Sequence, residues 1–600
     1  MSQYHAPLKE MHFVLNELAG LEQVGKLPGF EDATSDTVAA ILDEAAKFAT
    51  EVLDPLNAVG DREGARWLDD GSVQTPTGFK AAYLQYCANG WNGLTKNPEF
   101  GGQGLPQLVA TAVEEMWHAA NMAFDLCPLL TQGAIEAIEL CGTAEQKERF
   151  LPKMVEGVWT GTMNLTEPQA GSDLAAVRTR ATPQADGSFK LYGQKIFITY
   201  GEHDYTENII HLVLARTPTA PEGVKGISLF IVPKFLINAD GSLGARNDVH
   251  CVSIEHKLGI HASPTAVLAY GDQGGAIGYL VGEENRGLEY MFIMMNLARF
   301  SVGLEGVGIA ERAYQRAATY AKERVQGRSV GAGQGDTTAT IIQHPDVRRM
   351  LLSMKAQTEA MRALAYVTAA ALDNARAHPD AKARGQHQAF VELMIPVVKG
   401  WCTETAQEIT STGVQVHGGM GFIEETGAAQ HYRDVRIITI YEGTTGIQAN
   451  DLIGRKTARD GGKIALAVVA QMQAVEAELG KQPGAEFAAI RAQLSAALAA
   501  LKAAIEWVVH TYAEDSRAAH AASVPYLKLW GLAAGGWQMA RAALVAARRL
   551  AEGKGDGSFY RAKIATARFY ADYYLPQTTA LKHAVVTAGE SVLALADEQF

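Results

Sequence analysis

The spacing of apolar residues changes twice along the chain and separates helical parts from a sheet-forming part. From Ser35 to Leu53 apolar residues recur every three or four positions, which predicts an amphipathic helix that Ser35 caps and Pro55 ends. Helical spacing continues to about Trp159. Short runs rich in β-branched and aromatic residues, separated by Gly, Pro, Asp and Asn, then follow at 189–199, 208–216, 227–233 and 265–270. These runs predict a sheet or barrel domain.

Long helical patterns return after residue 283. They lie at about 287–325, 345–377, 384–412 and 446–460, and Pro396 should kink or divide the third of them. The chain becomes rich in alanine beyond residue 461, and the segment 486–515 has Ala and Leu on most faces, so we expect it to pack on more than one neighbour. An interfacial membrane helix is the alternative for 486–515, but only Arg491 and Lys502 are basic there.

Length and composition indicate a globular protein of several domains. The chain has 600 residues, 48% of them hydrophobic and 20% charged, which is ordinary globular usage and leaves room for two to four domains. The net charge of −13 is spread along the chain and repels phosphate backbones, so we expect no nucleic acid partner.

Cysteine usage and the start of the chain bear on location. The five cysteines are far apart and show no metal-ligand spacing, which favours core thiols in a reducing compartment and no metal site. The first residues lack a signal-peptide pattern, and no window reaches 18 uncharged apolar residues. We therefore expect a cytoplasmic protein without a membrane span.

Three segments stand out as candidates for chemistry. They are NLTEPQAGSD at 164–173, QVHGGMGF at 415–422 and ITIYEGTTGIQ at 438–448. Taken singly, the glycines fit a helix terminator, and Glu167 or Glu442 fits a solvated loop carboxylate. The chain has no GxGxxG motif that follows a strand and opens a helix, and no P-loop motif, so neither common nucleotide-binding signature is present.

Together with Lys195-Ile-Phe-Ile-Thr199, these segments occur in one order on a helix–sheet–helix layout. In this combination the chain closely resembles the acyl-CoA dehydrogenase family over about residues 35–460. Residues 1–34 and 461–600 resemble those of an extended subgroup of about 600 residues, which includes 3-methylmercaptopropionyl-CoA dehydrogenases and bacterial enzymes acting on longer fatty acyl-CoAs.

The resemblance implies an α+β fold of the acyl-CoA dehydrogenase kind. Its expected parts are an N-terminal extension (1–34), an N-terminal helical domain (35–160), a middle β-barrel or sheet domain (161–283), a helical-bundle catalytic domain (284–460) and an additional C-terminal helical domain (461–600).

The resemblance also implies FAD-dependent α,β-dehydrogenation of an acyl-CoA to the trans-2-enoyl-CoA. Glu442 matches the family's catalytic base, which removes an α-proton of the thioester while hydride leaves the β-carbon. Gly443 matches a substrate-binding position where a side chain would crowd the thioester. The backbone N–H of the base is expected to help hold the thioester oxygen, in the manner of an oxyanion hole.

Further positions are carried over from the family motifs. Phe197 and Thr199 match the aromatic-x-Thr that packs on and hydrogen-bonds the flavin, with Phe197 where many relatives have Trp. Ser172 and Arg299 match positions near the CoA arm, and Thr444 should also cap the following helix. The full set expected to bind the cofactor is Thr166, Ser172, Phe197, Thr199, Arg324, Gln415, Gly418, Gly419 and Thr444.

The resemblance leaves the electron acceptor and the partners to be settled. An electron-transfer flavoprotein is expected to reoxidise the flavin, while an acyl-CoA oxidase would use O2 at the same site. A non-catalytic, nucleic-acid-binding relative is a third possibility, for which a local basic patch exists at Arg541, Arg548, Arg549, Lys554 and Arg561. Arg324 resembles a residue that crosses a subunit interface to FAD, which implies a homodimer or a larger homo-oligomer. The acyl chain length is not encoded in any one motif.

Overall fold

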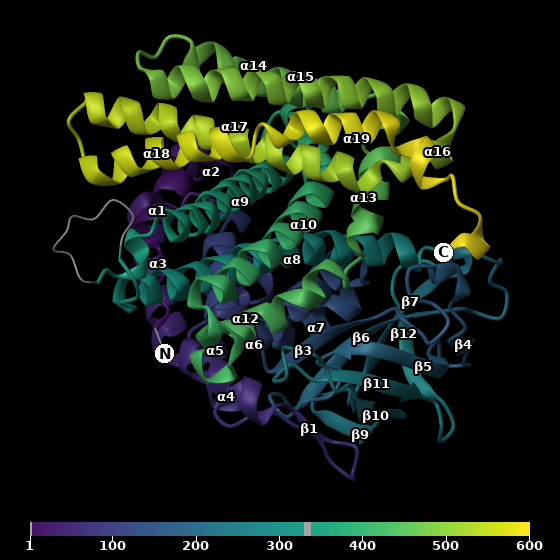
Figure 1. Ribbon diagram of the computed structural model, residues 1–600. Helices are drawn as coiled ribbons and strands as arrows, with labels where there is room; N and C mark the ends of the chain where they lie inside the picture. The colour runs from purple at the N-terminus through teal and green to yellow at the C-terminus, as the bar shows by residue number, and fades with distance from the viewer. Residues whose placement is uncertain (1–2, 329–337) are drawn as a thin grey trace. The chain divides into compact units, whose positions relative to one another are not determined.

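A computed structural model describes residues 3–328 and 338–600 (Figure 1). Internal contacts divide the chain into two units. Unit 1 contains Met1–Ala46, Pro106–Ala119 and Val302–Phe600, and unit 2 contains Lys47–Leu105 and Ala120–Ser301. Three of the four divisions fall inside helices α3 (Ser35–Phe48), α6 (Gln107–Cys141) and α8 (Gly287–Glu323), and the fourth, between Leu105 and Pro106, lies just before α6.

Unit 2 is built around a mixed sheet of eight strands. The strand order is β10–β11–β5–β12–β7–β6–β3, with β4 beside β5, and the β3–β6 pair is parallel while the other pairs are antiparallel. The strands are β3 (Trp159–Asn164), β4 (Arg180–Pro183), β5 (Phe189–Thr199), β6 (Asn208–Ala215), β7 (Ser228–Pro233), β10 (Val249–Ile254), β11 (Thr265–Tyr270) and β12 (Ala276–Leu280). The four predicted runs form β5, β6, β7 and β11, and the α+β class is confirmed.

The side chains of β6 alternate between two clusters of buried apolar residues, one on each face of the sheet. Leu212 and Leu214 belong to one cluster of buried apolar residues, whereas Val213 and Ala215 belong to a second cluster. Successive residues of a strand point to opposite faces, so both faces of the sheet are covered here. Every residue of β6 and β7 is buried in consequence, which is why these runs are predominantly apolar in the sequence.

Several smaller elements of unit 2 were not predicted. Strands β1 (Arg66–Trp67) and β2 (Val73–Gln74) form a hairpin within the region expected to be helical throughout, and β8 (Phe235–Ile237) pairs with β9 (Leu243–Arg246). The helices wholly within unit 2 are α4 (Asp54–Glu63), α5 (Phe79–Ala88) and α7 (Ala144–Glu156).

The predicted helix at Ser35–Leu53 forms, but both of its predicted ends were wrong. Thr34 caps α3, because its Oγ1 accepts a hydrogen bond of 3.2 Å from the backbone N–H of Thr37, and Ser35 is the first helical residue. A π-helical turn at Ala49–Leu53 leads directly into α4. Pro55 lies in the first turn of α4, directly after the π-helical turn, and so it does not stop the helix there.

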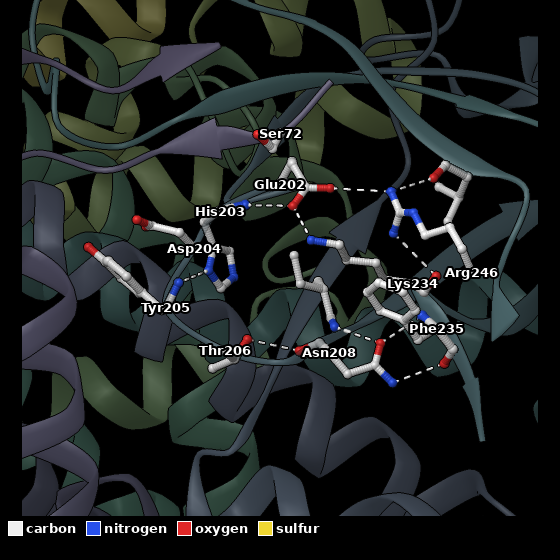
Figure 2. A network of polar contacts seen from close by, with 12 residues as sticks. Ser72, Glu202, His203, Asp204, Tyr205, Thr206, Asn208, Lys234, Phe235 and Arg246 are labelled. Carbon is white, nitrogen blue, oxygen red and sulfur yellow. Dashed lines mark hydrogen bonds and ion pairs between the residues drawn. The ribbon is translucent and has the colours of Figure 1, made fainter. Parts of the chain in front are cut away.

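The loop between β5 and β6 is fixed by a polar network within unit 2 (Figure 2). The Glu202 carboxylate accepts the backbone N–H of His203 at 3.2 Å and pairs with Lys234 and, at 3.5 Å, with Arg246. Oδ1 of Asn208 accepts the backbone N–H of Phe235 at 2.9 Å, and Nδ2 of Asn208 donates to the carbonyl of Phe235 at 3.0 Å. This network anchors the segment that follows β5, the strand that carries Phe197 and Thr199.

Unit 1 is helical. Helices α9 (Pro345–Ala377) and α10 (Ala381–His417) are joined by a three-residue loop and pack along each other. Helix α10 runs through Pro396 without division, so of the predicted kink or division the division does not occur. Three shorter helices follow: α11 (Gly419–Phe422), α12 (Ala428–Asp434) and α13 (Thr445–Gly454).

The tail beyond residue 461 is helical, as predicted. Helices α17 and α18 pack against α9, and α17 also packs against α10 and α13, so the tail covers the bundle of unit 1 (Figure 1). The tail consists of α14 (Lys463–Leu479), α15 (Ala485–Glu514), α16 (Ser516–Ala521), α17 (Ser523–Ala551), α18 (Gly557–Tyr573) and α19 (Gln577–Val592).

The N-terminal extension packs on this tail, a contact that the sequence did not reveal. The extension contains α1 (Leu8–Phe13), a π-helical turn (Val14–Leu18) and α2 (Leu21–Val24). Glu17 forms ion pairs with Arg548 at 2.7 Å and with Arg549, and Arg541 donates to the carbonyl of Leu18 at 2.7 Å. Three of the five residues of the predicted basic patch are thus engaged by the extension.

Among residues 3–328 and 338–600, two helices, α8 and α15, are long and apolar enough to cross a membrane by length and composition alone. The apolar window of α8 is 78% buried inside the protein, as in the core helix of a globular protein, and that of α15 is 44% buried. Helix α15 packs against α14, α17, α18 and α19, in line with the prediction that it has several neighbours.

Candidate active site

The loop that leads into α13 has an unusual backbone. Glu442 has φ +53° and Gly443 has φ +83°, so two consecutive residues lie in the left-handed region. Glycine adopts this conformation readily, whereas for a residue with a side chain it costs about 1–3 kcal/mol. A Cβ atom on Gly443 would also lie 2.8 Å from Nε2 of Gln448. Both conformation and space therefore favour glycine at 443.

Donors from two helices hold this strained loop. The buried Lys399 of α10 donates from Nζ to the carbonyl of Gly443 at 2.7 Å. Nε2 of Gln448, on α13, lies 3.1 Å from the carbonyl of Glu442 and 3.2 Å from that of Gly443. The backbone around Glu442 is thus fixed by side chains that are themselves buried, which is the arrangement that can sustain strain.

A second carboxyl group lies beside the loop. The hydroxyl of Tyr441 donates a hydrogen bond to Oε2 of Glu305, a residue of α8 with no exposed surface. Oε1 of Glu305 has no hydrogen-bond partner among the described residues. Burial raises the pKa of Glu305 to about 8. The negative charge of Glu442 also raises this pKa, whereas the hydrogen bond from Tyr441 and the positive charge of Lys399 lower it.

Thr444 caps the helix after the loop, as predicted. Its Oγ1 accepts the backbone N–H of Ile447 at 3.2 Å. The next residue, Thr445, donates to Oε1 of Glu404 on α10 at 2.5 Å. Glu442 itself is half-buried.

The glycine segment at the end of α10 is open to solvent. Gly418 ends the helix with φ +61°, which accounts for glycine there by conformation alone. At Gly419 φ is unexceptional, and a Cβ atom would meet no atom within 4 Å. Packing therefore gives no reason for glycine at 419, and the exposed backbone at this point leaves room for a ligand. Gln415, one turn earlier, is also exposed.

Arg324 lies just beyond the last turn of α8 and is exposed. Its backbone carbonyl accepts the N–H of Ile341 at 2.8 Å. Within residues 3–328 and 338–600 the guanidinium group takes part in no ion pair.

Phe197 lies at a β-bulge in β5. Opposite it on β11 the pairing shifts between Ala266 and Leu268, so two residues of β5 face one residue of β11. Phe197 has φ +58°, and its side chain is 59% exposed. A bulge re-aims a side chain, and here it turns a large aromatic ring out of the sheet towards solvent.

Two of the other predicted residues of unit 2, Thr166 and Thr199, lie beside this bulge in the backbone pairing. The carbonyl of Thr166 accepts the N–H of Ile196 at 2.9 Å, and Thr199 pairs with Thr265 across the β5–β11 ladder. Ser172 is exposed in the loop after β3, whereas Arg299 of α8 is 4% exposed. Thr166, Phe197 and Thr199 are thus brought together by backbone pairing.

Glu167 has a structural role in the loop after β3. Its carboxylate accepts the backbone N–H groups of Arg178 and Thr179 at 2.7 and 3.0 Å, and it pairs with the buried Lys195 at 2.8 Å. Burial alone would raise the pKa of Glu167, but Lys195 and these donors lower it to about 2. An ionised, fully bonded carboxylate of this kind holds the loop closed and is a poor proton acceptor.

The predicted site residues fall into two groups, one on each unit. Unit 2 holds Thr166, Ser172, Phe197, Thr199 and Arg299, and unit 1 holds Arg324, Gln415, Gly418, Gly419, Glu442, Gly443 and Thr444. The sequence analysis missed Glu305, Lys399 and Gln448. Glu305 and Lys399 are single charges within apolar helical runs, VGLEGVG and PVVKGW, and this is the signal that could have revealed them.

Family models cover most of the chain. The descriptions are "Acyl-CoA dehydrogenase, N-terminal domain" for residues 35–158, "middle domain" for 162–272, "C-terminal domain" for 285–456, and "Acetyl-CoA dehydrogenase C-terminal like" for 468–596. The chain is also 51% identical over 590 residues to 3-methylmercaptopropionyl-CoA dehydrogenase of Ruegeria pomeroyi, covering 98% of this chain and 99% of that protein.

Solved structures share the fold. The structure of Caenorhabditis elegans ACDH-11 in complex with C11-CoA matches with a TM-score of 0.75 at 20% identity, over 96% of this chain and 93% of that one. Acyl-CoA dehydrogenase complexed with FAD from Bacillus anthracis matches with a TM-score of 0.72 at 22% identity, over 98% and 92%.

Proposed function

This chain belongs to the acyl-CoA dehydrogenase family, whose members are FAD-dependent oxidoreductases, and we propose that it converts a saturated acyl-CoA thioester to the trans-2-enoyl-CoA. The observation that carries the proposal is the left-handed Glu442–Gly443 backbone, which side chains on two helices hold in place. Strain of this kind persists where a function requires it.

Glu442 is proposed as the base. Its carboxylate would take the α-proton of the thioester, and closure of the site over an apolar acyl chain would strengthen its affinity for that proton. The Glu442 N–H would donate to the thioester oxygen and stabilise the enolate-like charge that develops there. Bound FAD supplies the acceptor for the hydride that leaves the β-carbon.

Each unit, taken by itself, carries residues that fit a part of FAD. On unit 2, the exposed Phe197 ring offers a stacking surface, with Thr166 and Thr199 as neighbouring hydrogen-bonding groups. On unit 1, the open backbone at Gly418 and Gly419 would admit the dinucleotide arm. Gln415, Thr444 and Arg324 complete the proposed set, with Arg324 reaching the FAD of a partner subunit in a homodimer or larger homo-oligomer.

Substrate contacts are proposed for Ser172, Arg299 and Gly443. The relative from Ruegeria pomeroyi supports 3-methylmercaptopropionyl-CoA as the acyl thioester, and straight fatty acyl-CoAs are the alternative. A panel from 3-methylmercaptopropionyl-CoA to palmitoyl-CoA, assayed with a dye acceptor and with product identification, tests both. Absence of enoyl-CoA from every member of the panel would contradict the proposed reaction.

An electron-transfer flavoprotein is proposed as the electron acceptor. The matched families and the relative from Ruegeria pomeroyi are dehydrogenases and lend no support to the oxidase alternative. Stopped-flow reoxidation of the reduced enzyme in air distinguishes the two, because an oxidase would react with O2 within a turnover. The engagement of Arg548, Arg549 and Arg541 by the N-terminal extension also counts against a nucleic-acid-binding surface there.

A further inference from the structure

Glu305 is a buried titratable group beside the loop of the proposed base, and the proposed reaction does not use it. It lies on α8, 136 positions before Tyr441 in the chain, and accepts the hydroxyl proton of the residue that directly precedes Glu442. Its side chain is completely buried, and its second oxygen makes no hydrogen bond within the described part of the chain. An uncompensated carboxyl oxygen is expensive to bury, so its retention beside the loop calls for a reason.

The loop is held from two opposite ends. Tyr441 is fixed to α8 through Glu305, and Gly443 is fixed to α10 through Lys399 at 2.7 Å. Glu442 lies between these two anchors with the strained φ of +53°. Release of either anchor would let residues 441–443 relax towards ordinary backbone conformations and would move the Glu442 carboxylate and N–H away from their working positions.

We propose that Glu305 is a positioning residue for the dehydrogenation, which fixes the base through the Tyr441 hydroxyl and whose charge adjusts how strongly Glu442 binds a proton. This inference rests on the proposed role of Glu442 as the base. The charged and titratable groups that face Glu305 are Tyr441 and Glu442 on the loop and Lys399 on α10.

The direction of the charge effect follows from like-charge repulsion. Below about pH 8 Glu305 is neutral, because burial raises its pKa to about 8. As the pH rises through this value Glu305 becomes an anion, and a second negative charge near Glu442 raises the proton affinity of Glu442. A carboxylate with a higher proton affinity is a stronger base, so the rate of α-proton removal should rise across this pH range.

Three variants separate the two parts of the inference. Glu305→Gln retains an oxygen that can accept from Tyr441 but cannot ionise, so the rise of kcat through about pH 8 should disappear while FAD content is retained. Glu305→Leu and Tyr441→Phe each remove the anchor, and each should lower kcat about 10- to 100-fold with a much smaller change in KM. The double variant should lose no more than either single variant, because both remove one interaction.

The kinetic isotope effect with α-deuterated acyl-CoA supplies a readout that a folding defect would not change. It should increase in Glu305→Leu, because proton removal then limits turnover more strongly. Glu311→Gln is the matched control: Glu311 lies on the same helix, is 6% exposed and binds Arg362 at 2.7 Å. That variant should lower thermal stability while the pH profile and isotope effect stay as in the wild type.

The outcomes distinguish this inference from the proposed function. If wild-type enzyme forms enoyl-CoA, Glu442→Gln does not, and both Glu305 variants match the wild type in kcat, pH profile and isotope effect, the role of Glu305 is refuted while the function stands. If Glu442→Gln is fully active, the base lies elsewhere, and the role of Glu305 fails together with the assignment of Glu442, while the proposed reaction is still judged by formation of the enoyl-CoA.

Discussion

The Nζ atom of Lys399 donates a hydrogen bond of 2.7 Å to the carbonyl of Gly443, the residue after the proposed base. Lys399 is fully buried on α10, 44 positions earlier in the chain. The buried ammonium group of Lys399 needs a hydrogen-bond acceptor, and the strained loop needs a donor to hold its backbone. The hydrogen bond between Lys399 and Gly443 meets both needs.

Lys399→Met should therefore act mainly on turnover. Methionine fills a similar volume but leaves the Gly443 carbonyl with Gln448 alone, so we expect kcat to fall roughly tenfold while FAD content and KM change little. Lys528→Met is the control, because Lys528 is 44% exposed in its ion pair with Glu408 and exposed pairs contribute little. Wild-type kcat in Lys399→Met would show that the loop does not depend on this anchor.

Glu442→Gln should bind FAD and acyl-CoA almost normally and lose catalysis. The amide has nearly the same shape but cannot accept the α-proton, and loss of a general base costs about 10²–10⁴-fold. Anaerobic mixing with substrate should give a spectral shift from binding without bleaching of the flavin. Glu425→Gln is the control, because Glu425 is an exposed carboxylate of the same unit. If the flavin of Glu442→Gln bleaches as fast as the flavin of this control, the base lies elsewhere.

Gly443→Ala adds only one methyl group but should strongly disturb the conformation of the loop. The backbone at φ +83° costs an alanine about 1–2 kcal/mol, and its Cβ would lie 2.8 Å from Nε2 of Gln448. We expect a strong loss of kcat with FAD retained. Gly446→Ala is the matched control, since its Cβ would meet only Oγ1 of Thr444 at 3.7 Å. Equal activities of the two variants would show that catalysis does not depend on the left-handed backbone at 443.

Phe197→Ala should weaken FAD binding without lowering the stability of the apoprotein. The ring is 59% exposed, so folding gains little from it, whereas stacking on the flavin is worth about 0.5–1.5 kcal/mol, or roughly two- to tenfold in Kd. Phe197→Trp keeps an aromatic ring at this position and should therefore retain the wild-type Kd for FAD. Val252→Ala, on the exposed side of β10, should leave the Kd for FAD unchanged, and titration of the apoproteins with FAD compares all three.

The sequence allowed the strands and long helices to be predicted where one local rule decides the outcome. The apolar runs of β6 and β7 could be recognised because both faces of these strands are buried. Pro55 was misinterpreted because proline is compatible with both a helix stop and a first helical turn, and only the observed start of α4 separates the two. The domain boundaries, the cytoplasmic location and the oligomeric state stay predictions.

Contacts between distant residues could not be predicted from local patterns. Glu305 and Tyr441 are 136 residues apart, and Glu17 and Arg549 are 532 apart, so no window of sequence contains either pair. The bulge at Phe197 depends on the register between β5 and β11, which neither strand specifies alone. The family motifs pointed to Glu442 and Phe197, but the structure was needed to show what holds them.

Glu167→Gln should destabilise the enzyme in a pH-dependent way. The folded pKa of Glu167 is about 2, below its ordinary value of 4.5, so its ionised form stabilises the fold above about pH 4.5 and this contribution is lost as the pH falls towards about 2. The Tm of the variant should therefore lie well below that of the wild type at neutral pH, and the difference should shrink as the pH falls through this range. Glu222→Gln, an exposed carboxylate of the same unit, should follow the wild type throughout. A Tm difference for Glu167→Gln that stays constant from neutral pH to acid would mean that the pairing of Glu167 with Lys195 contributes nothing to folding.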